Sequence, residues 1–176
     1  MTKLTIFAMA ATLIAGPVLA HGGEDHSADH TPKMMAVLKN PEGQEVGTVT
    51  ADPTASGVMH VVIDVHSLPQ GVQAIHIHET GACAPDFKAS GGHLTGGKEH
   101  GILSENGPHA GDMPNLHIPE NGKLTVEYFV PALTEEMIMD QDGSAVIIHA
   151  GADDYASHPA GHAGDRSACG VFEATK

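Results

Sequence analysis

The chain is poor in the residues on which many binding surfaces depend. Trp is absent, aromatic residues make up 3% of the 176 positions, and Lys and Arg number 8 against 22 Asp and Glu. The resulting net charge of -14 argues against nucleic acid as a partner, because a polyanion is bound by Lys and Arg. The shortage of aromatic side chains argues equally against a lectin-like or base-stacking surface.

Histidine is the residue type that stands out. The chain has 14 His, more than its Lys and Arg together, and it also has 21 Gly. Neutral imidazole is the commonest metal ligand in proteins, so this excess points towards metal chemistry.

The first 20 residues have the pattern of a secretory signal peptide. Lys3 supplies the positive start, residues 4–15 form an apolar run, and residues 18–20 fit a small-residue cleavage site. The run is short for a transmembrane helix, and no Cys follows the cleavage position to carry a lipid. The sequence therefore predicts export without a membrane anchor.

Residues 21–33 are expected to form a flexible, His-rich N-terminal tail. Three histidines alternate there with acidic residues, and no apolar periodicity is present: His21, His26 and His30. Such a group can capture a divalent ion, or it can be a solvated leader without a binding role. Both interpretations stay open.

Residues 34–176 are expected to form one all-β domain. Short apolar or β-branched runs separated by Gly, Pro and Asn are typical of a β-sandwich or barrel. The expected strands are 34–39, 46–50, 58–65, 72–78, 124–130, 145–149 and 170–172, with one helical turn within 134–139. Residues 81–114 and 150–168 are expected to be long loops, and loops of that length are usually functional.

A pair of histidines lies inside one expected strand. His76 and His78 are two residues apart, so their side chains point to the same face of the strand. Two such imidazoles form half of a metal site, although exposed polar positions on a strand explain the pattern equally well.

The first long loop carries three more histidines and an aspartate: His93, His100, His109 and Asp112. Three imidazoles and one carboxylate make a closed tetrahedral set for zinc. The loop must wrap around the ion, and its many glycines give the backbone that freedom.

Five further positions are candidates: three lie at or in the second loop, and two are the cysteines. His149 ends an apolar strand, and Asp153 is placed to orient ligand imidazoles or to form an acidic turn. Arg166, the only arginine, is either an anion-binding group or a partner of one of the many acids. Cys83 and Cys169 are a disulfide candidate in an exported protein.

Taken together, these segments resemble the copper/zinc superoxide dismutase family in its exported, periplasmic bacterial branch. The resemblance runs from about residue 34 to residue 174. It is carried by His76-Ile77-His78-Glu79, Gly91-Gly92-His93-Leu94, Gly107-Pro108-His109-Ala110-Gly111-Asp112, Ile148-His149-Ala150-Gly151-Ala152-Asp153 and Arg166-Ser167-Ala168-Cys169-Gly170-Val171.

The resemblance implies an eight-stranded Greek-key β-barrel with a zinc/disulfide loop and an electrostatic loop. It implies copper on His76, His78, His93 and His149, and zinc on His93, His100, His109 and Asp112. It also implies that Asp153 links the two sets, that Arg166 and the bridging His93 act in catalysis, and that Cys83 pairs with Cys169.

The implied activity is dismutation of superoxide to dioxygen and hydrogen peroxide, as antioxidant defence outside the cytoplasm. One alternative is a non-catalytic periplasmic protein that binds copper and zinc. A zinc hydrolase is a further alternative, but it needs an open zinc position, and the expected zinc set is closed. Monomer or homodimer, and the partner that delivers copper, stay open.

Deleting residues 21–30 tests the tail. If the tail captures metal, the shortened protein acquires less copper or zinc when supply is limiting, because it has lost three imidazoles. The measurement is metal content after growth in depleted medium. Equal metal loading of both proteins would identify the tail as a solvated leader.

Overall fold

The structure is a computed structural model, and it describes residues 31–176. The expected signal peptide and all but the last three residues of the expected tail lie outside the described residues. Lys33 is hydrogen-bonded to the fold, since its N–H donates to Asp52 Oδ1 at 2.6 Å. In the part of the chain that is described, no helix is long and apolar enough to cross a membrane.

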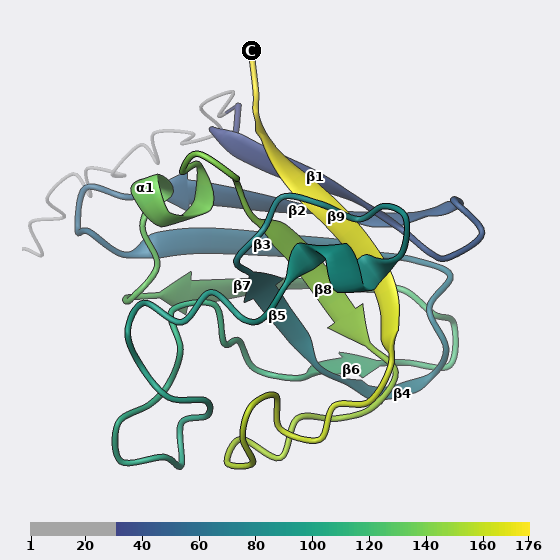
Figure 1. Ribbon diagram of the computed structural model, residues 1–176. Coiled ribbons are helices and arrows are strands. Elements are labelled where there is room, and N and C mark those ends of the chain that lie inside the picture. Colours follow the sequence, from purple (N-terminus) through teal and green to yellow (C-terminus); the bar gives the residue numbers. More distant parts are fainter. Residues whose placement is uncertain (1–30) are drawn as a thin grey trace, which may run out of the picture. The chain divides into compact units, whose positions relative to one another are not determined.

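Short antiparallel strands, joined by turns and loops, build the described part of the chain (Figure 1). The strands are β1 (Met34–Lys39), β2 (Glu45–Pro53), β3 (Met59–Val65), β4 (Gly71–Gln73), β5 (Ile75–His78), β6 (Leu116–Ile118), β7 (Leu124–Val130), β8 (Ala145–His149) and β9 (Arg166–Ala174). Two short helices are η1 (Phe87–Ser90) and α1 (Glu135–Ile138). One sheet has the order β5-β8-β9-β1-β2-β3-β7, and β4 pairs with β6.

The expected fold class, an eight-stranded Greek-key β-barrel, is confirmed. β4 and β5 together correspond to the single strand expected over 72–78, and Ala74 interrupts it. The Ala74 N–H donates to the Gly151 carbonyl, and its own carbonyl accepts the His149 N–H. Counting β4 and β5 as one interrupted strand gives eight.

Two expectations about the secondary structure need correction. β6 was not expected, because only three residues pair there, between Pro114 and Pro119. The second loop ends at residue 165 rather than 168, because β9 already begins at Arg166. Polar Arg166 and Ser167 do not have the apolar pattern of a strand, yet Arg166 pairs with His149 on β8.

β8 is buried along its whole length, and two different layers cover it. Val146 and Ile148 belong to the main core of the barrel. Ala145 and Ile147 instead pack with Cys169, beneath Cys83 and Phe87 of the first loop. The continuous apolar sequence of β8 follows from this burial on both faces.

The expected disulfide is present. Cys83 and Cys169 are bonded, with their Cα atoms 5.9 Å apart and a sequence separation of 86. The bond fixes the start of the first loop to the middle of β9.

Removing this disulfide should lower the free energy of unfolding by about 4–5 kcal/mol, because the unfolded chain regains the entropy of an open loop of that length. The test is urea unfolding of the Cys83→Ala/Cys169→Ala variant against the oxidised parent. The matched control adds reductant to both proteins, which should destabilise the parent only. Equal midpoints for variant and parent would contradict the expectation.

Candidate metal centre

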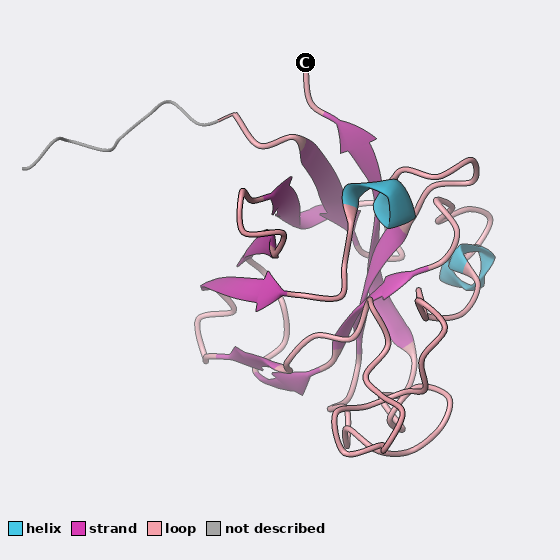
Figure 2. Ribbon diagram, turned by 90° about the vertical axis from the view of Figure 1, so that its left-hand side faces the viewer, coloured by secondary structure: helices cyan, strands magenta, loops and turns pink. Residues whose placement is uncertain are grey.

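The second long loop and the later part of the first lie at one end of the barrel, below the strands in Figures 1 and 2, whereas η1 of the first loop lies over β8 and β9. β5 and β8 bring their histidines to this end as an antiparallel pair, in which Ile75 lies opposite Ile148. Ile75 and Ile77 are fully buried in the core, as the alternation of β5 predicted.

The first loop returns to β5 and pairs with this strand at each of its two histidines. His78 forms a bridge with His93, and His76 forms one with Asp112. Gly111 allows this close return, because a Cβ at that position would lie 2.4 Å from the Ile77 carbonyl oxygen. The backbone pairing therefore places residues 93 and 112 beside the two strand histidines.

Four buried imidazoles converge at this point: His76, His78, His93 and His149. Three of them use one ring nitrogen as a hydrogen-bond donor, with Asp153, the Gly91 carbonyl and the Gly164 carbonyl as acceptors. Each of the four rings keeps one buried nitrogen that has no hydrogen-bond partner among the described residues: His76 Nδ1, His78 Nε2, His93 Nε2 and His149 Nε2. Buried polar atoms are rarely left unpaired, so this group fits a metal ion.

A second group forms next to the first: His93, His100, His109 and Asp112. The Asp112 carboxylate lies 2.9 Å from His93 Nδ1, 3.0 Å from His100 Nδ1 and 3.3 Å from His109 Nδ1. Three imidazole nitrogens around one carboxylate are the donors of a closed tetrahedral zinc site.

His93 belongs to both groups, with a different nitrogen in each. Its Nδ1 faces Asp112, and its Nε2 faces the four-histidine group. The rings of His76 and His93 are 4.0 Å apart between centroids. The sequence expectation that one ring joins two adjacent pockets therefore has the geometry it needs.

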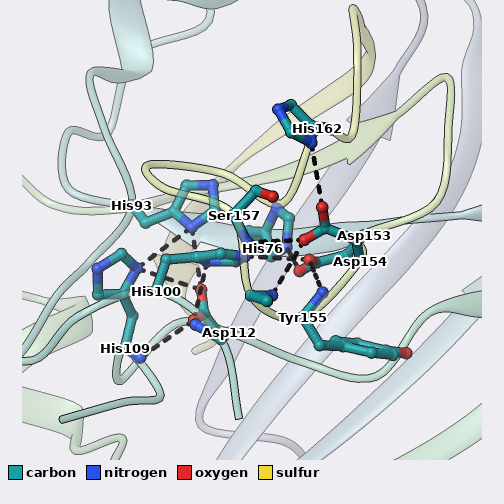
Figure 3. A network of polar contacts seen from close by, with 12 residues as sticks. His76, His93, His100, His109, Asp112, Asp153, Asp154, Tyr155, Ser157 and His162 are labelled. Atoms are coloured by element: carbon teal, nitrogen blue, oxygen red, sulfur yellow. Dashed lines mark hydrogen bonds and ion pairs between the residues drawn. The ribbon is translucent and has the colours of Figure 1, made fainter. Parts of the chain in front are cut away.

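Asp153 connects the two groups by hydrogen bonds to one histidine of each (Figure 3). Its Oδ2 accepts from His76 Nε2 at 2.7 Å, and its Oδ1 accepts from His100 Nε2 at 3.0 Å. Burial alone would raise the pKa of this carboxyl, but the bonds from His76, the Tyr155 N–H and His100 lower it to about 2. The carboxylate fixes which nitrogen of each ring stays available to a metal.

Burial lowers the pKa of the strand histidines. The pKa is about 4 for His76, about 2 for His78 and about 4 for His149, and desolvation is the main cause in each case. Burial alone would raise the pKa of Asp112, but hydrogen bonds from His93 and the Gly101 N–H hold it below its usual range. Neutral imidazoles and ionised carboxylates are the forms that bind metals.

Arg166 reaches the site from β9, directly opposite His149. Its guanidinium donates to the Phe87 and Gly91 carbonyls and to Ser90 Oγ, at 2.6–2.9 Å. Three of the five N–H donors are thereby used, and two remain. All three acceptors, which lie within the described residues 31–176, are neutral. These contacts therefore favour the interpretation of Arg166 as an anion-binding group over its interpretation as the partner of an acid. Main-chain acceptors leave no signal in a sequence, so residues 87 and 91 were not expected.

Two loop histidines stay outside both groups. His162 is 80% exposed and lies 3.1 Å from Asp154, and exposed His158 lies 3.8 Å from Glu99. The described residues give neither of them a place in the metal centre.

Fold and site define a class of protein: an all-β barrel with two adjacent groups of candidate metal ligands that share one imidazole. The family model for copper/zinc superoxide dismutase (SODC) matches residues 45–172. The chain therefore belongs to the copper/zinc superoxide dismutase family.

Individual relatives and solved structures are similar to this chain over most of its length. Superoxide dismutase (Cu-Zn) 1 of Aquifex aeolicus is 42% identical over 149 residues, covering 80% of this chain and 88% of the relative. The solved Cu/Zn superoxide dismutase from Brucella abortus is 30% identical, with a TM-score of 0.66 over 79% of this chain and 98% of that one. A SOD-like protein from Bacillus subtilis is 38% identical, with a TM-score of 0.73 over 78% of this chain and 96% of its own.

The metal-free protein should lose stability as the pH falls from about 6.5 to 4. In this window the unfolded chain protonates its histidines, while folded His76, His78 and His149 stay neutral because their pKa values are lowered. The unfolded state then binds more protons, and each such histidine lowers the free energy of unfolding by up to about 1.4 kcal/mol per pH unit.

Urea unfolding of the metal-free protein across this range measures the slope. A His78→Gln variant should have a shallower slope, and His117→Gln, at an exposed position on β6, serves as the control. A parent slope that is flat between pH 6.5 and 4 would show that the buried histidines are not held neutral.

Proposed function

We propose that this chain dismutates superoxide, converting two superoxide ions and two protons into dioxygen and hydrogen peroxide. The observation that carries the proposal is the sharing of His93 between a four-imidazole group and a His₃Asp group. The chain is an oxidoreductase of the Cu-Zn type, and its cofactors are copper and zinc.

We propose copper on His76, His78, His93 and His149, and their four unpaired nitrogens support this. We propose zinc on His93, His100, His109 and Asp112, supported by the three Nδ1 atoms around the Asp112 carboxylate. Copper supplies a one-electron redox cycle when bound, whereas zinc supplies a fixed positive charge without redox chemistry.

His93 is the proton carrier in this proposal. Its Nδ1 is committed to the zinc group, so Nε2 is the atom that can take a proton and give it up. Formation of hydrogen peroxide consumes protons beside the reacting oxygen, and Nε2 lies where the four-imidazole group converges. Asp153 keeps His76 and His100 in the tautomers that leave their Nδ1 atoms free for the metals.

Arg166 is the group that attracts and orients the anion. The chain carries a net charge of -14, so its general field repels superoxide, and a local positive charge is needed at the site. The three bonds to the first loop hold the guanidinium at Gly91, whose carbonyl also accepts from His78 Nδ1, with two donors left for the anion.

The alternative, a non-catalytic copper/zinc-binding protein, is less well supported. Storage requires neither a ring shared between two metals nor a guanidinium held beside them. The location supported by the N-terminal sequence is the periplasm, reached through the signal peptide, and the role there is antioxidant defence. The proposed domain limits are 1–20 for the signal, 21–33 for the tail and 34–176 for the enzyme.

Two substitutions test the assignment by metal analysis and superoxide decay. His149→Ala should lose copper, retain zinc and fall to background activity, because one of four copper nitrogens is gone. Arg166→Ala should retain both ions and lower kcat/KM by about tenfold or more, because a local attraction is lost.

Lys123→Ala is the matched control for charge, because it removes one exposed positive charge that lies directly before β7, outside both loops. It should leave kcat/KM close to that of the parent. Full copper and activity in His149→Ala would overturn the ligand set. A parent that binds both metals without accelerating superoxide decay would establish the storage alternative.

A further inference from the structure

Asp153 can orient His76 and His100 only if its own backbone is held in place. Asn115, directly before β6, is buried and supplies that hold through its side chain. Its Nδ2 donates to the Asp153 carbonyl at 2.9 Å, and its Oδ1 accepts the Asp153 N–H at 2.9 Å. One carboxamide thus satisfies both backbone groups of the residue that connects the two metal groups.

Asn115 is in turn fixed by two tyrosine hydroxyls. Its N–H donates to Tyr155 Oη at 2.8 Å, and its carbonyl accepts from Tyr128 Oη at 3.3 Å. Tyr155 also donates its backbone N–H to Asp153 Oδ1 at 2.7 Å. Figure 3 shows Tyr155 beside Asp153, with its ring directed away from the carboxylate.

This arrangement joins three parts of the chain that are distant in sequence. Asn115 follows the loop that carries His93, His100, His109 and Asp112, Asp153 belongs to the second loop, and Tyr128 belongs to β7. Space behind Asp153 is also restricted, since a Cβ at Gly161 would lie 1.7 Å from Asp153 Oδ1. The carboxylate therefore has little freedom to move while Asn115 is in place.

We propose that Asn115 is a positioning residue of the metal centre: its carboxamide sets the place of Asp153 and thereby the alignment of His100 for zinc and of His76 for copper. Tyr155 supports it by fixing the Asn115 backbone. The proposal rests on the ligand assignment given under the proposed function.

The test is zinc affinity of the purified metal-free protein, measured by competition with a chromophoric chelator. Asn115→Ala should weaken zinc binding by about tenfold, the lower end of what loss of a ligand's supporting hydrogen bond costs. Tyr155→Phe, a milder change that retains the ring, should weaken it in the same direction by a smaller factor. Electron paramagnetic resonance of added Cu²⁺ should change in Asn115→Ala, because His76 shares the same carboxylate.

A control separates positioning from general destabilisation. Val49→Ala opens a cavity in the barrel core on β2, where its strand partners are Ala36 and Ile63, and should lower the melting temperature without changing zinc affinity or the copper spectrum. Parent-like zinc affinity in both Asn115→Ala and Tyr155→Phe would overturn the proposal. So would a loss of affinity in all three variants that follows their melting temperatures.

Asp112→Ala distinguishes an error in the ligand set from an error in the role of Asn115. If it loses zinc while Asn115→Ala does not, the ligand set stands and the role of Asn115 is wrong. If it binds zinc as the parent does, the ligand set itself is wrong, and the role assigned to Asn115 is overturned with it.

Discussion

The structure depends on one imidazole that takes part in two groups of ligands. His93 presents Nδ1 to Asp112 and Nε2 to three other histidines, so neither group can move without the other. Most features around the site help to keep His93 in contact with both groups. Antiparallel pairing brings His76 and His78 to the end of β5, the returning loop places His93 beside them, and Asp153 fixes the rings from behind. In His76, His78, His100 and His149 a hydrogen bond at one ring nitrogen selects the other nitrogen as the one available to a metal.

The barrel supplies the frame through burial on both faces of β8. One face belongs to the main core, and the other packs under the loop that carries Cys83 and Phe87. His149 at the end of this strand is therefore held from both sides. A register shift after Ile148 then places Arg166 opposite His149, so strand pairing with a local irregularity brings these two candidate site residues together.

Much of the fold could be predicted from the sequence. β1, β7 and β8 have the bounds that their apolar runs indicated, and the histidines of β5 share a face because the strand period is two. β6 could not be predicted, since three residues between two prolines have no measurable period. The break at Ala74 was equally hidden, because it follows from bonds to residues more than 70 positions away. Asn115 gave no signal, as an Asn beside Pro114 resembles any turn residue.

The attachment of Arg166 has a consequence for where the protein can work. Its three acceptors all lie in the segment that the Cys83–Cys169 bond ties to β9, so the position of the only guanidinium depends on a covalent link formed by oxidation. A newly made chain in a reducing compartment would have its ligand residues but lack the tether that aims its anion-attracting group. Formation of the Cys83–Cys169 bond and placement of the guanidinium are therefore linked, so correct positioning of Arg166 requires conditions in which the bond can form.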